Sequence, residues 1–416
     1  MRKMLVGVMA LALVLLCGIN KEAGASSIIR RANGSTQARP TGLPFLASVN
    51  MFSAQAGFAV ESSLLHILVT KDGGRQWRDV TPSGYTIIPA ESPLVPSLYD
   101  GLIGWIGSVT RRGVWVLGHA PSPHLLFYSD RTGKWAARTM PPLLVSETEW
   151  MAAPPPEVEF INQDVGWLLG YICNEASPSS TCSHSKVQLF RTVDGARTWH
   201  LVAAVGGSPV SSRGQGPSGT ATRMYFVNGK TGWLTGESTH SVWLYATNNG
   251  GVSWQNERIA SLESRYWQSA TSLPMQFDGP THGLLPVVLI HRGADKQALS
   301  EEFLVYVTSD SGVRWRRHGS VNVMTSFGAW PVWSASPSLT HIWVANIGCD
   351  CIDVTANTGR SWRQVSPPFA VPLLGELDFV NNLDGWAVLN MQTGPPSLYV
   401  TRNGGISWSL VHSRVS

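Results

Sequence analysis

A tryptophan preceded by the same turn-forming residues recurs seven times along this chain of 416 residues. In five copies a threonine stands seven residues before the tryptophan, an aspartate or asparagine five before it and a glycine three before it. These copies are Thr70/Asp72/Gly74/Trp77, Thr247/Asn249/Gly251/Trp254, Thr308/Asp310/Gly312/Trp315, Thr355/Asn357/Gly359/Trp362 and Thr401/Asn403/Gly405/Trp408. The two weaker copies are Thr192/Asp194/Ala196/Trp199, where alanine replaces glycine, and Asp130/Trp135, where the glycine has moved to position 133. Such a pattern indicates a repeat architecture rather than a single active site.

A second element precedes most copies of this repeat turn, and it usually begins with Gly-Trp. It reads VGWLLG at 165–170, TGWLTG at 231–236, DGWAVL at 384–389 and AGFAVE at 56–61, with looser versions at Trp115, Leu284 and Trp343. Each unit of about 46 to 64 residues has room for four short apolar runs separated by Asn, Asp and Gly, which is typical of a four-stranded meander. The sequence therefore predicts an all-β fold, a seven-bladed β-propeller of four-stranded antiparallel blades.

The residue types of the repeat turn suit a structural role. Glycine adopts a positive φ in the turn between the third and fourth strands, Asp or Asn accepts backbone N–H bonds there, and the threonine hydroxyl holds the other side. The tryptophan then packs against the neighbouring sheet. We therefore assign structural rather than catalytic roles to Asp72, Trp77, Asp130, Trp135, Asp194, Trp199, Asn249, Trp254, Asp310, Trp315, Asn357, Trp362, Asn403 and Trp408.

The pattern S/T-x-D/N-x-G-x-x-W resembles the Asp-box, or bacterial neuraminidase, repeat. Together with the preceding Gly-Trp strand, it is most similar to propellers related to the photosystem II assembly and stability factor, over about residues 45–412. That resemblance implies a seven-bladed, non-catalytic binding platform. The superfamily also holds sialidases and xyloglucanases, but this chain lacks the sialidase Arg-Ile-Pro motif and has length for only one propeller. A photosynthetic partner does not follow from the residues.

The first residues have the three regions of a secretory signal peptide. Arg2 and Lys3 precede an apolar run, and Ala23 and Ala25 occupy the small positions before a cleavage site after residue 25. Lipidation at Cys17 is disfavoured because a leucine precedes it, and a retained anchor is disfavoured because the apolar run is short. The predicted organisation is a signal peptide at 1–25, an N-terminal segment at 26–44 and the propeller at 45–416. The mature protein is predicted to be secreted or extracytoplasmic, without a membrane span.

The charge of the mature chain argues against nucleic acid as a partner. Removing residues 1–25 takes away three of 31 basic and one of 27 acidic residues, so the formal net charge becomes 28 − 26 = +2. Only 14% of the residues are charged and there is no basic tract. We expect a monomer without a cofactor.

Four cysteines remain after the signal peptide. Cys173 and Cys182 flank a polar loop, and we predict a disulfide between them. Cys349 and Cys351 are two residues apart, where two free thiols or a strained bridge are both favoured over a metal site, which would need two further ligands. We predict no metal.

The sequence predicts a binding function for the variable loops. The long insertions all fall in turns between second and third strands or in crossings to the next blade, and these share one rim. In the crossing at 261–274, Arg265, Tyr266 and Trp267 cluster outside any repeat turn and are of types enriched at binding hot spots, although Trp267 folding back to cover the core is an equal alternative. We expect a non-catalytic propeller that binds a protein or a cell-envelope glycan. The competing hypothesis is a glycan-cleaving hydrolase, for which the carboxylate pairs Glu157/Glu159 and Glu301/Glu302 were weighed as acid and base and disfavoured.

Overall fold

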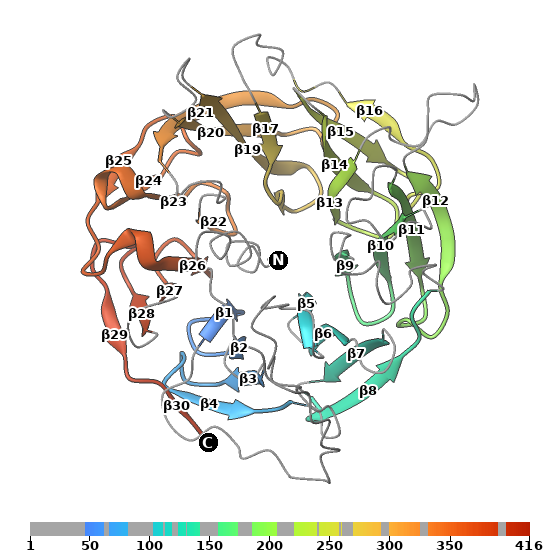
Figure 1. The fold of residues 1–416 in the computed structure, drawn as a ribbon, viewed down its shortest axis with the longest axis horizontal. Coiled ribbons are helices and arrows are strands. Elements are labelled where there is room, and N and C mark those ends of the chain that lie inside the picture. Colours follow the sequence, from blue (N-terminus) through green and yellow to red (C-terminus); the bar gives the residue numbers. More distant parts are fainter. Residues whose placement is uncertain are drawn as a thin grey trace, which may run out of the picture.

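The computed structural model is a closed ring of seven β-sheets around a central axis (Figure 1). The seven-bladed, all-β fold predicted from the repeats is thereby confirmed. The structure describes residues 46–61, 66–81, 103–110, 113–118, 124–129, 131–141, 157–173, 185–205, 220–238, 241–257, 259, 269–292, 299–324, 332–389 and 397–416. In this part of the chain no helix is long and apolar enough to cross a membrane.

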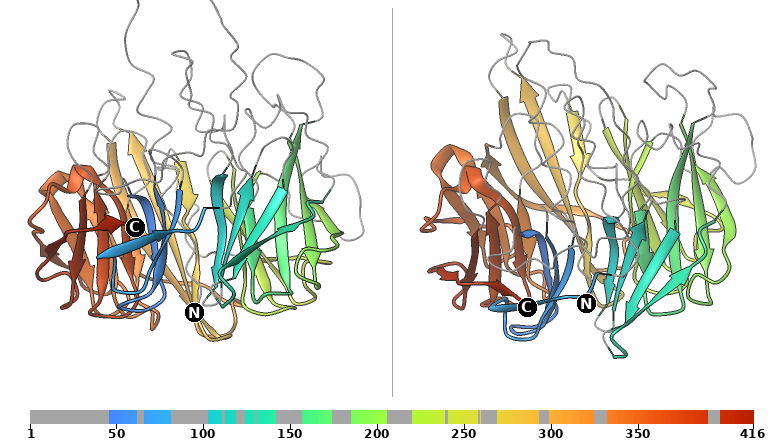
Figure 2. Two further views of the ribbon diagram at one scale, coloured as in Figure 1. Left: turned by 90° about the horizontal axis from the view of Figure 1, so that it is seen from below. Right: turned by 60° about the horizontal axis from the view of Figure 1, so that its bottom comes forward.

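Each blade is a meander whose first strand lies nearest the axis and whose fourth lies outermost (Figures 1 and 2). The first strands are β1 (Leu46–Met51), β5 (Ile103–Thr110), β9 (Glu157–Phe160), β13 (Thr220–Phe226), β17 (Ser269–Ser272), β22 (Trp333–Ala335) and β26 (Leu374–Phe379). The second strands are β2 (Gly57–Glu61), β6 (Gly113–Gly118), β10 (Gly166–Cys173), β14 (Gly232–Ser238), β19 (His282–Arg292), β23 (Ile342–Asn346) and β27 (Gly385–Leu389).

The outer half of each blade completes the antiparallel pairing. The third strands are β3 (His66–Thr70), β7 (His124–Ser129), β11 (Ser185–Thr192), β15 (Ser241–Thr247), β20 (Leu299–Thr308), β24 (Cys351–Thr355) and β28 (Ser397–Thr401). The fourth strands are β4 (Gln76–Asp79), β8 (Lys134–Arg138), β12 (His200–Val205), β16 (Gln255–Glu257), β21 (Arg316–Val323), β25 (Arg363–Val365) and β29 (Ser409–Val411). The remaining elements are β18 (Gln276–Asp278), which pairs with β19, β30 (Arg414–Val415), and the short 3-10 helices η2 (Ile347–Cys349) and η3 (Val371–Leu373).

The six repeat turns described in full share one set of hydrogen bonds. In the fourth blade the Thr247 hydroxyl donates to Asn249 Oδ1 over 2.9 Å and accepts the Gly251 N–H over 3.0 Å. Asn249 Oδ1 also accepts the Ser253 N–H over 2.9 Å. Two consecutive residues of this turn, Gly250 and Gly251, have positive φ of 76° and 98°, so a second position of the turn favours glycine besides the one in the repeat.

The tryptophans that end the repeat turns lie between blades. Trp77, Trp254, Trp315 and Trp408 are buried, whereas Trp135, Trp199 and Trp362 are partly exposed. Asp130 lies outside the described residues.

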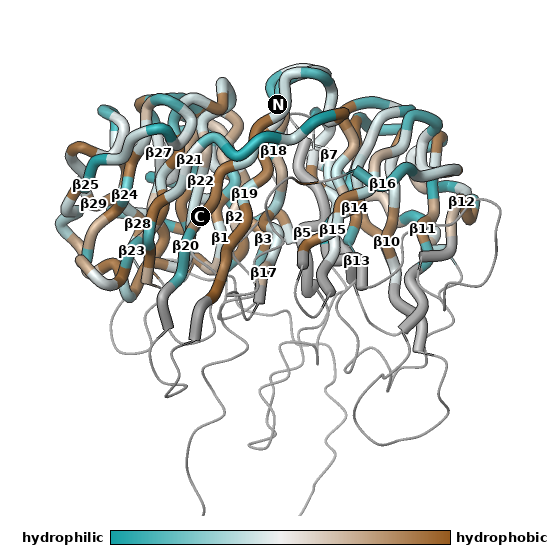
Figure 3. Tube along the Cα trace, turned by 90° about the horizontal axis from the view of Figure 1, so that it is seen from above, coloured by the Kyte–Doolittle hydropathy of each residue, from teal (hydrophilic) through white to brown (hydrophobic). Residues whose placement is uncertain are grey.

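The turns joining first to second and third to fourth strands lie on one rim, here called the turn rim. Within a blade the two turns bond to each other, as when the Gly250 N–H donates to Lys230 O and the Gly404 N–H to Leu383 O. Figure 3 shows mainly hydrophilic residues along this rim and hydrophobic ones in the strands. The strands that flank the long insertions end on the opposite rim, as Cys173 and Ser185 do where β10 pairs with β11. The insertions themselves lie largely outside the described residues.

Candidate binding cleft between the fifth and sixth blades

Most junctions between blades are filled by a stacked pair of aromatic rings. The tryptophan of the Gly-Trp strand lies flat on a phenylalanine of the next blade, which stands at the end of the first strand or, in the fifth blade, in β18. The stacked pairs and their centroid distances are Trp115–Phe160 at 3.7 Å, Trp167–Phe226 at 3.7 Å, Trp233–Phe277 at 4.2 Å and Trp343–Phe379 at 3.5 Å. This packing removes large apolar surfaces from water at each junction.

The glycine of the Gly-Trp strand makes room for that phenylalanine. A Cβ on Gly232 would lie 2.3 Å from the Phe226 ring, and one on Gly385 would lie 2.4 Å from the Phe379 ring, both too close for a real contact. The phenylalanine stands six residues before the glycine in both cases. The fixed spacing of phenylalanine and Gly-Trp is visible in the sequence, but the repeat turn alone assigns this phenylalanine no role.

Three junctions lack the stacked aromatic pair. Between the seventh and first blades Trp386 shares a buried apolar cluster with Met51, which stands where most other blades have phenylalanine. Between the fifth and sixth blades the strand carries Leu284 in place of tryptophan, and the sixth blade has Ala335 and Ile342 at the phenylalanine and glycine positions. These three residues belong to one buried apolar cluster. Between the first and second blades the strand carries Phe58.

Two cavities lie near these departures from the stack, one between blades and one within the first blade. One of about 410 Å³ opens between the fifth and sixth blades, and one of about 380 Å³ is lined by Phe58, Val69, Thr70 and their neighbours in the first blade. The larger one is here called the polar cleft, and it is lined by Asp278, His282, Gly283, Val307, Thr308, Ser309, Asp310, Arg314, Arg316, His318, Ser338, Leu339, Thr340 and Thr358. It lies on the turn rim, because residues of both blades' turns form its walls.

A hydrogen-bonded histidine joins the two walls of the polar cleft. His318, on β21, has Nδ1 2.8 Å from the carbonyl oxygen of Thr358 in the sixth blade. Its Nε2 lies 2.9 Å from Arg360 Nε, which donates to it. These partners fix the neutral tautomer with the proton on Nδ1, since a carbonyl only accepts and a guanidinium only donates. The backbones approach so closely here that a Cβ on Gly319 would lie 1.8 Å from Gly359 O.

Cationic and hydroxyl groups face the polar cleft. Arg314 and Arg316 are exposed, and within the described residues their guanidinium groups form no hydrogen bond or ion pair. The Asp310 carboxylate, by contrast, accepts hydrogen bonds from the Arg314 N–H and the Thr308 hydroxyl within its own turn. Desolvation alone would raise the pKa of this carboxyl, but these hydrogen bonds lower the pKa overall. The cleft can therefore present arginine donors to a carboxylate.

Two residues with left-handed backbone conformation line this cleft. Of the five non-glycine residues with positive φ in the described chain, Leu339 at 59° and Thr358 at 58° line it. Residues held in this conformation cost free energy, and such strain is common at functional sites.

The carboxylates weighed as acid and base are engaged in structural contacts. Glu157 Oε2 accepts the Met224 N–H over 2.8 Å, and Glu159 Oε2 accepts the Phe226 N–H over 2.9 Å, so both tie β9 to β13 of the next blade. Glu302 pairs with Arg317, with 2.5 Å between Oε1 and Nη2.

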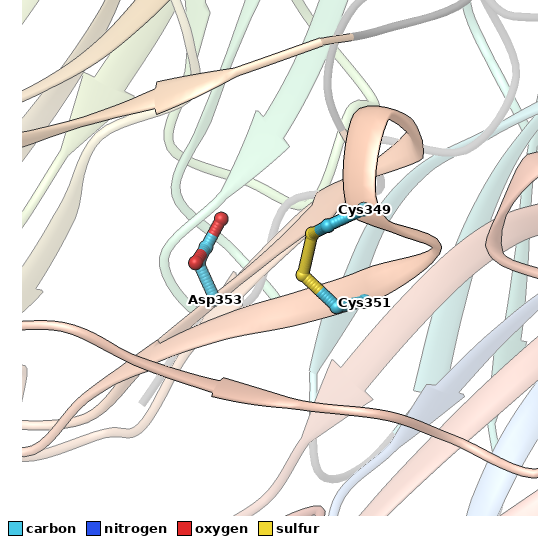
Figure 4. A group of neighbouring side chains, drawn as sticks. All are labelled: Cys349, Cys351 and Asp353. Atoms are coloured by element: carbon cyan, nitrogen blue, oxygen red, sulfur yellow. A yellow bond between two sulfur atoms is a disulfide. The ribbon is translucent and has the colours of Figure 1, made fainter.

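The structure describes only some of the other predicted site residues. Arg265, Tyr266, Trp267, Cys182 and the side chain of Cys173 lie outside the described part, so the predicted binding loop and the Cys173–Cys182 disulfide stay predictions. Cys349 and Cys351 are joined by a disulfide, which was one of the two alternatives favoured over metal (Figure 4).

These features define the class of the protein as a single-ring, seven-bladed β-propeller. No family model and no curated protein matches the chain. Among solved structures it is similar to YCF48 bound to D1 peptide, with a TM-score of 0.46 and 12% identity over 89% of this chain and 94% of that one. It is also similar to a puromycin-hydrolyzing peptidase of Mycobacterium tuberculosis, with a TM-score of 0.52 and 9% identity over 90% of this chain and 54% of that one.

An ulvan lyase of polysaccharide lyase family PL25 is similar as well, with a TM-score of 0.45 and 11% identity over 74% of this chain and 81% of that one. The neighbours thus include a peptide-binding protein, a peptidase and a lyase. At such identities the similarity shows the fold alone.

Proposed function

We propose that this chain is a non-catalytic, extracytoplasmic propeller that binds a carboxylate-bearing peptide segment of a partner protein in the polar cleft. The observation that carries the proposal is the pair of exposed arginines, Arg314 and Arg316, at a cavity beside the junction where aliphatic residues take the place of the aromatic stack. An exposed guanidinium can form two parallel hydrogen bonds with a carboxylate. Ser338 and Thr340 on the other wall add hydroxyl groups that can bond peptide or side-chain oxygens.

A peptide is favoured over a glycan by the chemistry of the lining. Sugar rings usually stack on aromatic faces, and no Trp, Tyr or Phe is among the described residues that line the cleft. Val307 and Leu339 instead offer small apolar surfaces beside the arginines, which suits a short peptide segment with both acidic and aliphatic side chains. Non-catalytic action is supported by the engagement of Glu157, Glu159 and Glu302 in structural contacts.

The test is a binding measurement on the chain from residue 26 with a fluorescent peptide that contains four consecutive glutamates. Replacing both Arg314 and Arg316 by Gln should weaken binding at least about tenfold, the loss expected for two charged hydrogen bonds, without lowering the melting temperature. Arg363→Gln is the matched control, because Arg363 is the exposed equivalent of Arg316 on the outer strand of the next blade. A peptide with glutamine in place of glutamate should not bind.

Two results would contradict the proposal. Equal binding by the double variant would remove the polar cleft as the site. Turnover of a sialoside or β-glucan panel, abolished by a single carboxylate substitution, would favour the hydrolase hypothesis instead.

A further inference from the structure

The Cys349–Cys351 disulfide lies at the connection between β23 and β24 of the sixth blade, away from the polar cleft. Cys349 is exposed, whereas Cys351 and Asp353 are each 2% exposed. The two sulfurs and a carboxylate oxygen of Asp353 all lie within 4.8 Å of one another (Figure 4). One sulfur can therefore be reached by a partner, and the other is enclosed beside a buried acid.

A purely structural role gives little reason for this disulfide. Its cysteines are two residues apart in one hairpin, and β23 and β24 already pair continuously from Ile342↔Thr355 to Asn346↔Cys351. Closing so short a loop removes little chain entropy from the unfolded state. The disulfide therefore adds little restraint to the hairpin of β23 and β24, which backbone pairing already holds together.

The surroundings of Asp353 hold its carboxyl in place. Asn346 Nδ2 donates to Asp353 Oδ2 over 2.8 Å, and Asn346 Oδ1 accepts the Gly348 N–H over 3.2 Å inside the cysteine turn. Asn346 thus links the turn to the acid as a positioning residue. Burial raises the pKa of Asp353, and hydrogen bonds from Asn346 and Gln364 reverse only part of that rise, so the proton is retained to a higher pH than on an exposed aspartate.

An exposed methionine lies against the turn that carries Cys349. Met324 is 51% exposed, and its carbonyl oxygen accepts the Ile347 N–H over 2.9 Å at the start of the cysteine turn. An exposed methionine is an adaptable contact for a polypeptide. This places an exposed apolar side chain against the cysteine turn, where a Cβ on Gly348 would lie 3.2 Å from Met324 Cβ.

We propose that Cys349, Cys351 and Asp353 form a thiol–disulfide exchange site that oxidises dithiols in polypeptides. A substrate thiolate attacks Cys349 Sγ, the Cys349–Cys351 bond breaks, and Cys351 Sγ leaves as a thiolate that takes the proton of the Asp353 carboxyl. A second substrate thiolate then attacks the substrate sulfur of the mixed disulfide, and Cys349 leaves as a thiolate. The substrate loses two electrons and gains a disulfide, while the protein gains a thiol at Cys351 and a thiolate at Cys349, and Asp353 is left ionised until it takes a proton from water. A small disulfide such as oxidised glutathione reverses the change in the protein.

The different roles of the two sulfurs, attacked at Cys349 and leaving at Cys351, are tested with glutathione on the folded chain from residue 26. Cys173 and Cys182 are replaced by serine in all the variants used. After reduction, the parent protein should re-form the Cys349–Cys351 bridge with oxidised glutathione and carry no adduct. Cys351→Ser should accumulate one glutathione on Cys349, because no second thiol can displace it. Cys349→Ser should carry less than about a tenth of that adduct, since Cys351 is buried. Mass spectrometry of proteolytic peptides measures all three.

The role of Asp353 is tested by the pH dependence of bridge reduction by dithiothreitol. With the rate expressed per thiolate, reduction should slow as the pH rises through the pKa of Asp353 in the parent protein. In Asp353→Asn the same rate should be independent of pH and at least about tenfold lower at acidic pH, the loss expected for a missing general acid. The amide can still bond Asn346 and Gln364, so the melting temperature should stay within about 2 °C, a change typical of a minor substitution.

The proposal is overturned if dithiothreitol reduces the bridge only when the protein unfolds, or if both single-cysteine variants acquire glutathione equally. The role of Asp353 as proton donor is overturned if Asp353→Asn keeps the pH dependence of bridge reduction that the parent protein has. A polypeptide dithiol that is oxidised no faster than by oxidised glutathione alone would show that the site does not act on polypeptides.

Discussion

At the scale of single residues, Asn249 and Asp194 show that asparagine and aspartate can occupy the same position of the repeat turn. Asn249 Nδ2 donates to the Ser253 hydroxyl over 2.7 Å, whereas the Thr198 hydroxyl donates to Asp194 Oδ2 over 2.7 Å. Oδ1 accepts the N–H four residues later in both turns. A hydroxyl can donate or accept, so the exchange of amide and carboxylate only reverses one bond.

Asn249→Asp should therefore change the free energy of unfolding by less than about 0.5 kcal/mol. Trp254→Ala in the same turn should lower it by about 3–5 kcal/mol, the usual cost of emptying a large aromatic site. Trp254 is 9% exposed and contacts Phe226 edge to face, and its Nε1 donates to Gly251 O over 2.9 Å. Chemical denaturation of both variants measures the contrast, and equal stabilities would contradict the packing of this ring between blades.

The chemistry of this turn was predictable because each bond runs between residues at fixed short spacing. Thr247, Asn249 and Gly251 could be assigned their roles from the sequence, since local turns depend on local residues. The second left-handed position was missed because serine and threonine occupy it in two blades, at Ser311 and Thr358. A side chain in that conformation breaks the glycine pattern on which the prediction relied.

At the scale of elements, the first strands of neighbouring blades are joined by carboxylates as well as by rings. Glu376 Oε2 accepts the Val49 N–H and Asp378 Oδ2 accepts the Met51 N–H, both over 2.6 Å. Side chains of β26 thus provide acceptors for the backbone N–H groups on the inner edge of β1. Glu157 does the same for β13 through the Met224 N–H. An unpaired strand edge is costly to bury, and these acids supply its acceptors.

The partly buried carboxyl of Glu157 predicts a pH-dependent stability. Burial raises its pKa to about 7, although the Arg223 charge and the Met224 N–H lower it in part. The folded protein therefore binds this proton more tightly than the unfolded chain does, and the associated stability is present below pH 4.5 and lost as the pH rises to about 7. Glu157→Gln stays neutral and keeps an acceptor for the Met224 N–H.

Over that window the wild type should lose about 1–3 kcal/mol of stability relative to Glu157→Gln. Thermal melts of the two proteins at several pH values measure the difference. Glu302→Gln serves as the control, because Glu302 lies in a surface pair with Arg317. A pH-independent difference between the wild type and Glu157→Gln would show that the carboxyl is not perturbed by burial.

Contacts between elements were only partly predictable from the sequence. The Gly-Trp strands are recognisable in the sequence, but most of their tryptophans stack on a phenylalanine of the next blade, and the local spacing of phenylalanine and Gly-Trp does not show which rings meet. The looser copies of the Gly-Trp element did not predict the packing of their junctions. Trp115 and Trp343 still stack on a phenylalanine of the next blade, whereas the strand at Leu284 has no such stack and a cavity opens near it.

At the scale of the whole molecule, the ring is closed by the end of the chain. After the last blade, β30 pairs in parallel with β4, the outer strand of the first blade (Figure 1). The Ser413 hydroxyl donates to Gly74 O over 2.6 Å, and Val415, 8% exposed, joins the apolar cluster around Trp77. The number of blades could be counted from the tryptophans, but this closure could not be predicted, because a two-residue strand has no periodicity to recognise.

At other junctions the segment after the outer strand of one blade also bonds to the next blade. The closure by β30 therefore repeats a contact that is found elsewhere in the ring. Ile259, which follows the outer strand of the fourth blade, forms a parallel bridge with Trp315 of the fifth. The Thr139 N–H and hydroxyl donate to Ala196 O in the third blade over 3.1 and 2.8 Å. β30 therefore contacts the first blade in the way that the segment after an outer strand contacts the next blade at these other junctions. This contact makes the ring continuous.

Deleting residues 413–416 should therefore open the last junction and lower the free energy of unfolding by about 2–4 kcal/mol, from one buried valine and a few hydrogen bonds. The carboxylate contacts of Glu376 and Asp378 with β1 remain, so the truncated ring should still fold. Arg414→Ala is the matched control: the side chain of Arg414 is exposed and its strand pairing uses the backbone, so its effect should stay below about 0.5 kcal/mol. Hydrogen exchange should rise in β1 and β4 of the truncated protein and stay unchanged in β15 and β16, on the far side of the ring. Uniform exchange, or a truncated protein as stable as the full chain, would show that β30 does not close the propeller.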